Sequence, residues 1–151
     1  MLGVTEALMA QKKGFNALAA ATKIYQAAGV ATTRRFIRES PDIVRRYIKS
    51  QIEAVHRIKT DRQTAKKVLL KYLGPQDKDV LERRYDYASA DERLPPKQYP
   101  TLEGIKNIIE SLAETDPKAK AAKPEDFVDM SFIKELDESG FVDDLYKGRK
   151  R

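Results

Sequence analysis

The densest group of side chains that could do chemistry is basic and lies between positions 34 and 49. Its members are Arg34, Arg35, Arg38, Arg45, Arg46 and Lys49. On a helix, positions 38, 45 and 49 share one face, because they are separated by seven and four residues. Such a face could contact phosphates, but no aromatic residue is interleaved on it as a stacking platform for bases. We expect Arg38, Arg45 and Lys49 to form a basic surface that contacts solvent or a protein partner, and we do not expect nucleic acid.

Patterns typical of catalysis or metal binding are missing from the sequence. His56 is the only histidine, and no serine, cysteine or aspartate arrangement is legible around it. The acidic pairs Asp137-Glu138 and Asp143-Asp144 lack the framing of a metal-binding loop. The seven glycines are dispersed rather than grouped in a phosphate-binding loop, and there is no cysteine. We therefore expect no enzymatic activity, no cofactor and no metal site.

Length and composition limit the class of protein. A chain of 151 residues suits one domain with its own core. Charged residues make up 34% of it and aromatic residues 8%, without tryptophan, which favours a soluble, helix-rich protein. No apolar run approaches the roughly 20 residues that cross a bilayer. The first residues also lack the basic start and apolar stretch of a signal peptide. We expect neither a transmembrane segment nor a signal peptide in this chain.

The net charge of +6 is unevenly distributed along the chain. Residues 1–74 carry 15 basic and 5 acidic side chains, a balance of +10, whereas residues 75–151 carry 14 and 18, a balance of −4. A basic half can indicate nucleic acid or another anionic partner. Solvated helix faces explain the same pattern, and the acidic second half offsets the field. We favour the solvated faces.

Helical patterns dominate the rest of the chain. The clearest helix start is Ser40-Pro41-Asp42, where serine can cap, proline suits the first helical position and aspartate favours the positive end of the dipole. Apolar residues then recur at helical spacing at Val44, Tyr47, Ile48, Ile52, Val55 and Ile58. Further helices are expected over residues 5–13, 60–73 (with a Thr60–Gln63 capping box), 77–90, 101–112, 131–138 and 142–146. Their expected core residues are Ala65, Val68, Leu69, Tyr72, Leu73, Val80, Leu81, Tyr85, Leu102, Ile105, Ile108, Ile109 and Leu112.

Two short stretches are predicted to be strands. Residues 15–21 are apolar and short, and residues 29–33 are rich in β-branched side chains. Two short strands do not form an independently stable sheet, because three or more are usually needed. We expect them to belong to a sheet whose other members are not in this chain.

Three segments resemble one protein family. Residues 123–146, KPEDFVDMSFIKELDESGFVDDLY, resemble the closing segment of extracytoplasmic solute-binding proteins of ABC importers, of the nitrate/sulfonate/taurine and thiamine-pyrimidine type. Residues 29–48, GVATTRRFIRESPDIVRRYI, are similar to the family's return strand and the helix after it. Residues 99–105, YPTLEGI, are similar to the start of a late helix in the family.

This resemblance implies an α/β fold of the type II periplasmic-binding-protein kind. The chain would be a fragment of it, mostly helical with a few short strands. Residues 1–28 would end the second lobe and approach the hinge, residues 29–146 would be the C-terminal portion of the first lobe, and residues 147–151 would be a basic tail. Such proteins close two lobes over a solute at a hinge. The family's first half is not in this chain, so Met1 would be an internal methionine.

The resemblance also implies a function. The chain would be the truncated solute-binding component of an ABC importer, a monomer that is periplasmic or extracytoplasmic. It would capture a small anionic or sulfur- or nitrogen-containing solute and deliver it to permease subunits. The basic face of Arg38, Arg45 and Lys49 would contact the permease or solvent. The candidate ligand contacts are Thr5, Glu6 and Gly29, although Thr5 as a helix cap and Gly29 as a flexible backbone position are alternative roles. A second hypothesis stays open: a small basic helical domain that binds nucleic acid or an acidic protein partner.

Overall fold

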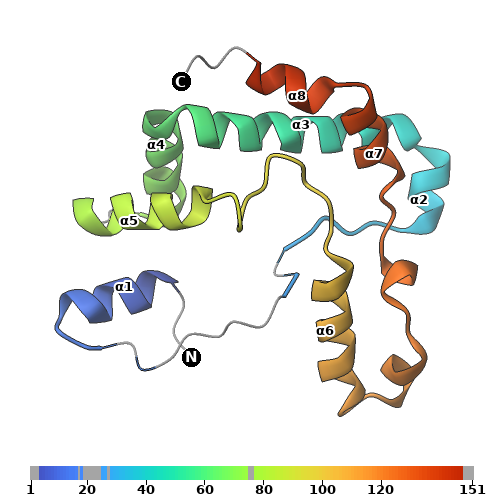
Figure 1. The fold of residues 1–151 in the computed structure, drawn as a ribbon, viewed down its shortest axis with the longest axis horizontal. Coiled ribbons are helices and arrows are strands. Elements are labelled where there is room, and N and C mark those ends of the chain that lie inside the picture. The colour runs from blue at the N-terminus through green and yellow to red at the C-terminus, as the bar shows by residue number, and fades with distance from the viewer. Residues whose placement is uncertain (1–3, 17, 19–24, 27, 75–76, 148–151) are drawn as a thin grey trace.

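The chain folds into helices joined by irregular segments (Figure 1). The computed structural model describes residues 4–16, 18, 25–26, 28–74 and 77–147. The long and medium helices are α1 (Val4–Lys12), α3 (Pro41–Thr60), α4 (Arg62–Leu73), α5 (Lys78–Ser89), α6 (Leu102–Ala113) and α7 (Ser131–Glu138). The short ones are α2 (Arg34–Glu39), α8 (Phe141–Tyr146) and the 3₁₀ turns η1 (Pro117–Ala121) and η2 (Pro124–Phe127).

The expected α/β fold is wrong, because the described residues form an all-helical structure without a strand. Residues 29–33 are irregular, and Thr33 ends this segment as the N-cap of α2, where its hydroxyl accepts a hydrogen bond from the Phe36 N–H at 3.0 Å. Residues 15, 16 and 18 are also irregular, and the rest of the strand expected at 15–21 lies outside the described residues. A strand is stable only when neighbouring strands pair its N–H and C=O groups. The helices around these segments offer no such pairing.

Helix α3 is the longest element and contacts α2, α4, α7 and α8. Its start at Pro41 and its acidic first turn at Asp42 agree with the sequence, since proline needs no hydrogen-bond acceptor at that position. Ile52 and Val55 are buried, as the apolar stripe predicts. The inward position expected for Tyr47 is wrong, because 46% of this residue is exposed.

The main core lies between α3 and the two closing helices. Helices α7 and α8 lie along one side of α3 (Figure 1). The buried cluster is small and consists of Ile52, Ile133, Leu136 and Val142. Gly140, with φ at 78°, allows the tight turn that folds α8 back onto α3. The closing run of the chain is therefore the segment that completes this core.

Helices α4 and α5 form a second packed unit at one end of α3. Asp61 caps α4 by accepting a hydrogen bond from the Thr64 N–H at 2.9 Å, so the expected Thr60–Gln63 capping box is wrong. On α5, Val80, Leu81 and Tyr85 are buried, as expected. On α4, Ala65 is buried, but the burial expected for its other apolar residues fails for Val68, Tyr72 and Leu73, which are exposed. One face of α4 is therefore left uncovered.

Helix α6 extends away from the α3 layer and contacts η1 and η2 (Figure 1). Its N-terminal end is held by the segment at residues 25–26: the Gln26 side-chain oxygen accepts from the Thr101 N–H at 2.9 Å. Gly104 is buried at this junction, where an added Cβ would lie 2.7 Å from the Gln26 nitrogen. The burial expected for the apolar residues of α6 is incomplete. Some of these residues are partly buried and others are exposed: Leu102, Ile105, Ile108, Ile109 and Leu112.

Candidate functional site

The loop between α5 and α6 is fastened to the closing helices by one carboxylate. Lys97 places its Nζ 2.6 Å from Asp137 Oδ1, and the Tyr99 hydroxyl donates to Asp137 Oδ2 at 3.0 Å. The Lys97 and Tyr99 hydrogen bonds lower the pKa of Asp137, while burial opposes them. The same pairing raises the pKa of Lys97, and burial together with Asp137 raises the pKa of Tyr99. At neutral pH, Asp137 is therefore a carboxylate that joins two segments far apart in sequence.

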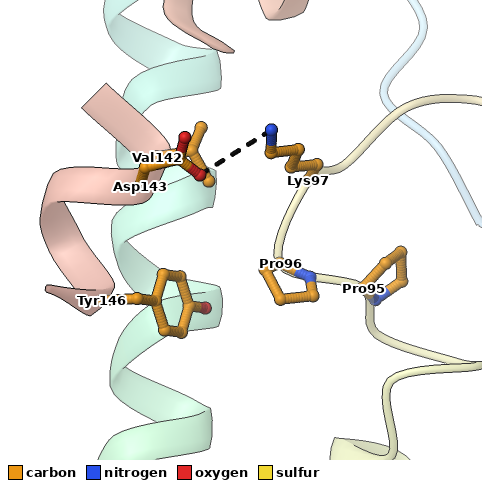
Figure 2. A pocket seen from close by; sticks show the side chains of 6 residues that line it. All are labelled: Pro95, Pro96, Lys97, Val142, Asp143 and Tyr146. Carbon is orange, nitrogen blue, oxygen red and sulfur yellow. Dashed lines mark ion pairs between the residues drawn. The ribbon is translucent and has the colours of Figure 1, made fainter. Parts of the chain in front are cut away.

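This fastening creates a groove between the loop and α8 (Figure 2). We call it the Pro95–Tyr146 groove, and its volume is about 460 Å³. Figure 2 shows the rings of Pro95 and Pro96 across the gap from Tyr146, with Lys97 reaching toward Asp143 at one end. The Lys97 Nζ lies 3.7 Å from Asp143 Oδ1. Six residues line the groove: Pro95, Pro96, Lys97, Val142, Asp143 and Tyr146.

The described residues that line the Pro95–Tyr146 groove are mostly apolar. Its only charged side chains, Lys97 and Asp143, face each other, and no nucleophile with a base beside it lines the groove. His56 contacts the edge of the Tyr146 ring, with centroids 4.8 Å apart and planes at 88°, so its role is packing. No group of three or more His, Cys, Asp or Glu side chains within the described ranges could hold a metal ion.

Comparisons with protein-family models, curated proteins and solved structures found no match. A functional conclusion therefore depends on the geometry above and on the sequence resemblance.

The three expected ligand contacts, Thr5, Glu6 and Gly29, are not among the residues that line the Pro95–Tyr146 groove. Thr5 lies inside α1, one residue past its start at Val4, rather than at the N-cap, and its side chain is outside the described part of the structure. Glu6 is exposed in the first turn of the same helix. Gly29 is exposed, and a Cβ added there would meet no atom within 4 Å. Their role in binding a solute stays a prediction.

The basic face expected from Arg38, Arg45 and Lys49 is divided between two helices, and its role as a solvated or permease-facing surface stays a prediction. Arg38 is exposed on α2, whereas the other two lie on α3, because the chain starts a new helix at Pro41. Arg45 Nε donates to Glu135 at 2.7 Å, and its Nη1 lies 2.6 Å from Asp42, so its pKa is raised. Lys49 places its Nζ 4.7 Å from the centre of the Phe141 ring. Two of the three charges therefore fasten the closing helices to α3.

A second basic group, which the sequence reading missed, lies between α4 and α5. A groove of about 290 Å³ runs between these helices, and we call it the α4–α5 groove. Its lining residues are Gln63, Lys66, Lys67, Leu70, Lys78, Leu81 and Glu82. The first four share one helix face by their i, i+3, i+4, i+7 spacing, and the last three share another. This spacing was legible in the sequence, but the pairing of the two faces depends on how α4 packs on α5.

The length and apolar character of the described helices test the expectation about membranes. None of them is long and apolar enough to cross one, in agreement with the expectation of no transmembrane segment.

Proposed function

We propose that this chain is a helical part of the solute-binding component of an ABC importer, and that it supports a solute cleft together with another polypeptide segment. In this proposal the component works in the periplasm or another extracytoplasmic compartment. It captures a small anionic or sulfur- or nitrogen-containing solute and delivers it to permease subunits. The strands expected in this chain are not part of the proposal, since the described residues are helical.

One observation carries the proposal: two amphipathic helices leave part of their apolar side chains exposed. On α6, Leu102 and Leu112 are 37% and 52% exposed, although apolar residues recur along this helix at the spacing of a core-facing stripe. On α4, Val68 and Leu73 are exposed as well. Soluble proteins rarely leave contiguous apolar surface uncovered. Such faces are expected in a chain whose core is completed by further polypeptide.

The resemblance of residues 29–48, 99–105 and 123–146 supports the particular family. Two of these segments contribute to the packing around α3 and its closing helices. The third includes the start of α6, where Gly104 allows close packing. These are structural roles, and they agree with a supporting part of a binding protein rather than with the cleft itself. The contacts of Arg45 with Glu135 and of Lys49 with Phe141 argue against a role for these two residues in binding nucleic acid.

The proposal is tested first at the open face of α6. We expect Leu112→Glu to reduce binding of the dye 8-anilinonaphthalene-1-sulfonate, because the substitution puts a charge on the apolar stripe. It should also weaken association with the opening-lobe segment of a complete solute-binding protein of this type, measured by sedimentation velocity. A desolvated charge opposed by no partner costs several kcal/mol at a protein interface.

Ser111→Glu is the matched control. Ser111 is the exposed neighbour of Leu112 on the same helix, and the introduced side chain is the same. We expect this variant to behave like the unmodified chain in both assays. If the two variants associate with the opening lobe equally well, the α6 face is not the surface that the second segment covers, and the proposal loses its main support.

A further inference from the structure

The α4–α5 groove holds more positive charge than its own carboxylate can balance. Three lysines line it, against the single carboxylate of Glu82. Glu82 is already shared, since it pairs with Lys66 and its Oε2 lies 2.5 Å from Arg62 Nη2. These two cations lower the pKa of Glu82. Among the described residues, Lys67 and Lys78 form no ion pair within 4.0 Å, and the only carboxylate whose pKa Lys67 helps to lower is Asp61, outside the groove lining.

The groove has an apolar floor between its charged rims. Leu81 is buried at 7% exposure, and Leu70 lies beside it at 37%. Lys67 and Lys78 are exposed, one on each helix that borders the groove. A binding partner with acidic groups flanking an apolar side chain would match both features of this surface. The match depends on charge and shape together, which is typical of specific protein contacts.

The shape of the groove decides between a small anion and a larger partner. Small-molecule sites bury most of the surface of their ligand. Here four of the seven lining residues are exposed, so a small anion would remain largely in water. Lysines also act as flexible point charges, without the fork geometry that holds phosphate in a bidentate way. An extended polyanion is disfavoured too, because the phosphates that dominate its binding make no use of the apolar floor of Leu70 and Leu81.

We propose that the α4–α5 groove is a docking surface for an acidic, amphipathic segment of a partner protein. The partner's carboxylates pair with Lys67 and Lys78, and an apolar side chain covers Leu70 and Leu81. This inference is independent of the proposed solute transport, since none of the exposed side chains that support that proposal lines the groove.

The probe is a synthetic helical peptide with glutamates along one face and leucines beside them. Its binding to the full chain is measured by fluorescence anisotropy, and the contact region is mapped by ¹⁵N–¹H chemical-shift changes. We expect the shifts to fall on α4 and the first turns of α5. Affinity should decrease as salt is raised, because the rim charges are exposed. A sister peptide with glutamine in place of glutamate should bind much more weakly.

The decisive variant combines Lys67→Glu with Lys78→Glu. We expect it to lower the affinity for the peptide on the order of tenfold or more, because the attraction between lysine and glutamate becomes repulsion between two carboxylates. The matched control is Lys118→Glu with Lys120→Glu, which makes the same charge change on the exposed η1 turn and should leave the affinity within about twofold. Circular dichroism checks that both variants stay folded. Equal weakening by the two variants would overturn the proposal, because it would show binding to overall charge. Tighter binding of duplex DNA or of anionic vesicles through the same lysines would also overturn it.

Discussion

The carboxylate of Asp137 contacts two residues of a distant loop. It lies on α7 and accepts contacts from Lys97 and Tyr99, both on the loop that precedes α6. Its carboxylate is only 17% exposed, so water competes weakly for it. Because buried charges are stable only when they are paired, this residue, Lys97 and Tyr99 depend on one another. The position of the loop, and with it the Pro95–Tyr146 groove, follows from these contacts.

Removing this carboxylate should change how stability depends on pH. The pKa of Asp137 is lowered in the folded chain, so the ionised form contributes stability above the unfolded pKa, and this contribution is lost as pH falls through the folded pKa. We expect Asp137→Asn to melt at a lower temperature than the unmodified chain at pH 7. The difference in melting temperature between the two chains should disappear as pH falls below about 4, near the ordinary pKa of an aspartate. Thermal melts followed by circular dichroism across pH 2–7 measure it.

Glu138→Gln is the control for this prediction. Glu138 is the exposed neighbour, and its nearest cation is Lys134 at 3.7 Å. Exposed pairs of this kind contribute little. The role given to Asp137 would be contradicted if Asp137→Asn lowered the melting temperature by the same amount at every pH. It would also be contradicted if Glu138→Gln lowered the melting temperature as much.

Two glycines give a second test at the residue scale. At Gly104 an added Cβ would lie 2.5 Å from the Thr101 hydroxyl oxygen and 2.7 Å from the Gln26 backbone nitrogen. We expect Gly104→Ala to lower the free energy of unfolding by about 1–3 kcal/mol, because the backbone at Gln26 must move. Gly29→Ala should change it by less than about 0.5 kcal/mol, since the space around Gly29 is open. Urea denaturation compares the two, and equal effects would show that the junction at α6 is not tightly packed.

At the scale of elements, α3 and the two closing helices form the most buried packing. Ile52 is fully buried between them, and Ile43, on the same helix, is 48% exposed. We expect Ile52→Ala to lower the free energy of unfolding by about 2–5 kcal/mol, because it leaves a cavity in the cluster with Ile133 and Val142. Ile43→Ala should cost about 1 kcal/mol or less. A similar loss for both variants, measured by urea denaturation, would mean that the core is elsewhere.

The helices could be predicted from the sequence because their signals are local. Pro41 and Asp42 mark the start of α3, and Gly140 separates α7 from α8. The predicted strand at residues 29–33 was wrong, because β-branched residues form a strand only when another strand is present to pair with them. The cap of α4 was misplaced by one residue, since Thr60 and Asp61 are both good caps and only packing decides between them.

The contacts around the two grooves were harder to predict than the helices, because they depend on which helix faces pack against each other. Arg45 and Glu135 are 90 residues apart, so nothing local indicates that they pair. The same holds for Lys97 with Asp137 and for the two sides of the α4–α5 groove. The ligand contacts at Thr5, Glu6 and Gly29 came from the family resemblance alone and remain predictions.

At the scale of the whole molecule, buried and exposed apolar side chains are unevenly distributed among the described helices. The closing run packs on α3, while Leu102 and Leu112 on α6 and Val68 and Leu73 on α4 stay exposed. A chain of this length usually buries most of its apolar surface in one core. The proposed packing of further polypeptide against this chain depends on these exposed side chains.

The most direct test of this account is solute binding by a fusion in which the opening lobe of a complete solute-binding protein of this type precedes this chain. Isothermal titration calorimetry would compare the fusion, this chain alone and the complete protein, with taurine, nitrate and thiamine pyrimidines as solutes. The account predicts that the fusion binds a solute and that this chain alone binds none. A fusion that is folded by circular dichroism but binds none of the solutes bound by the complete protein would contradict it.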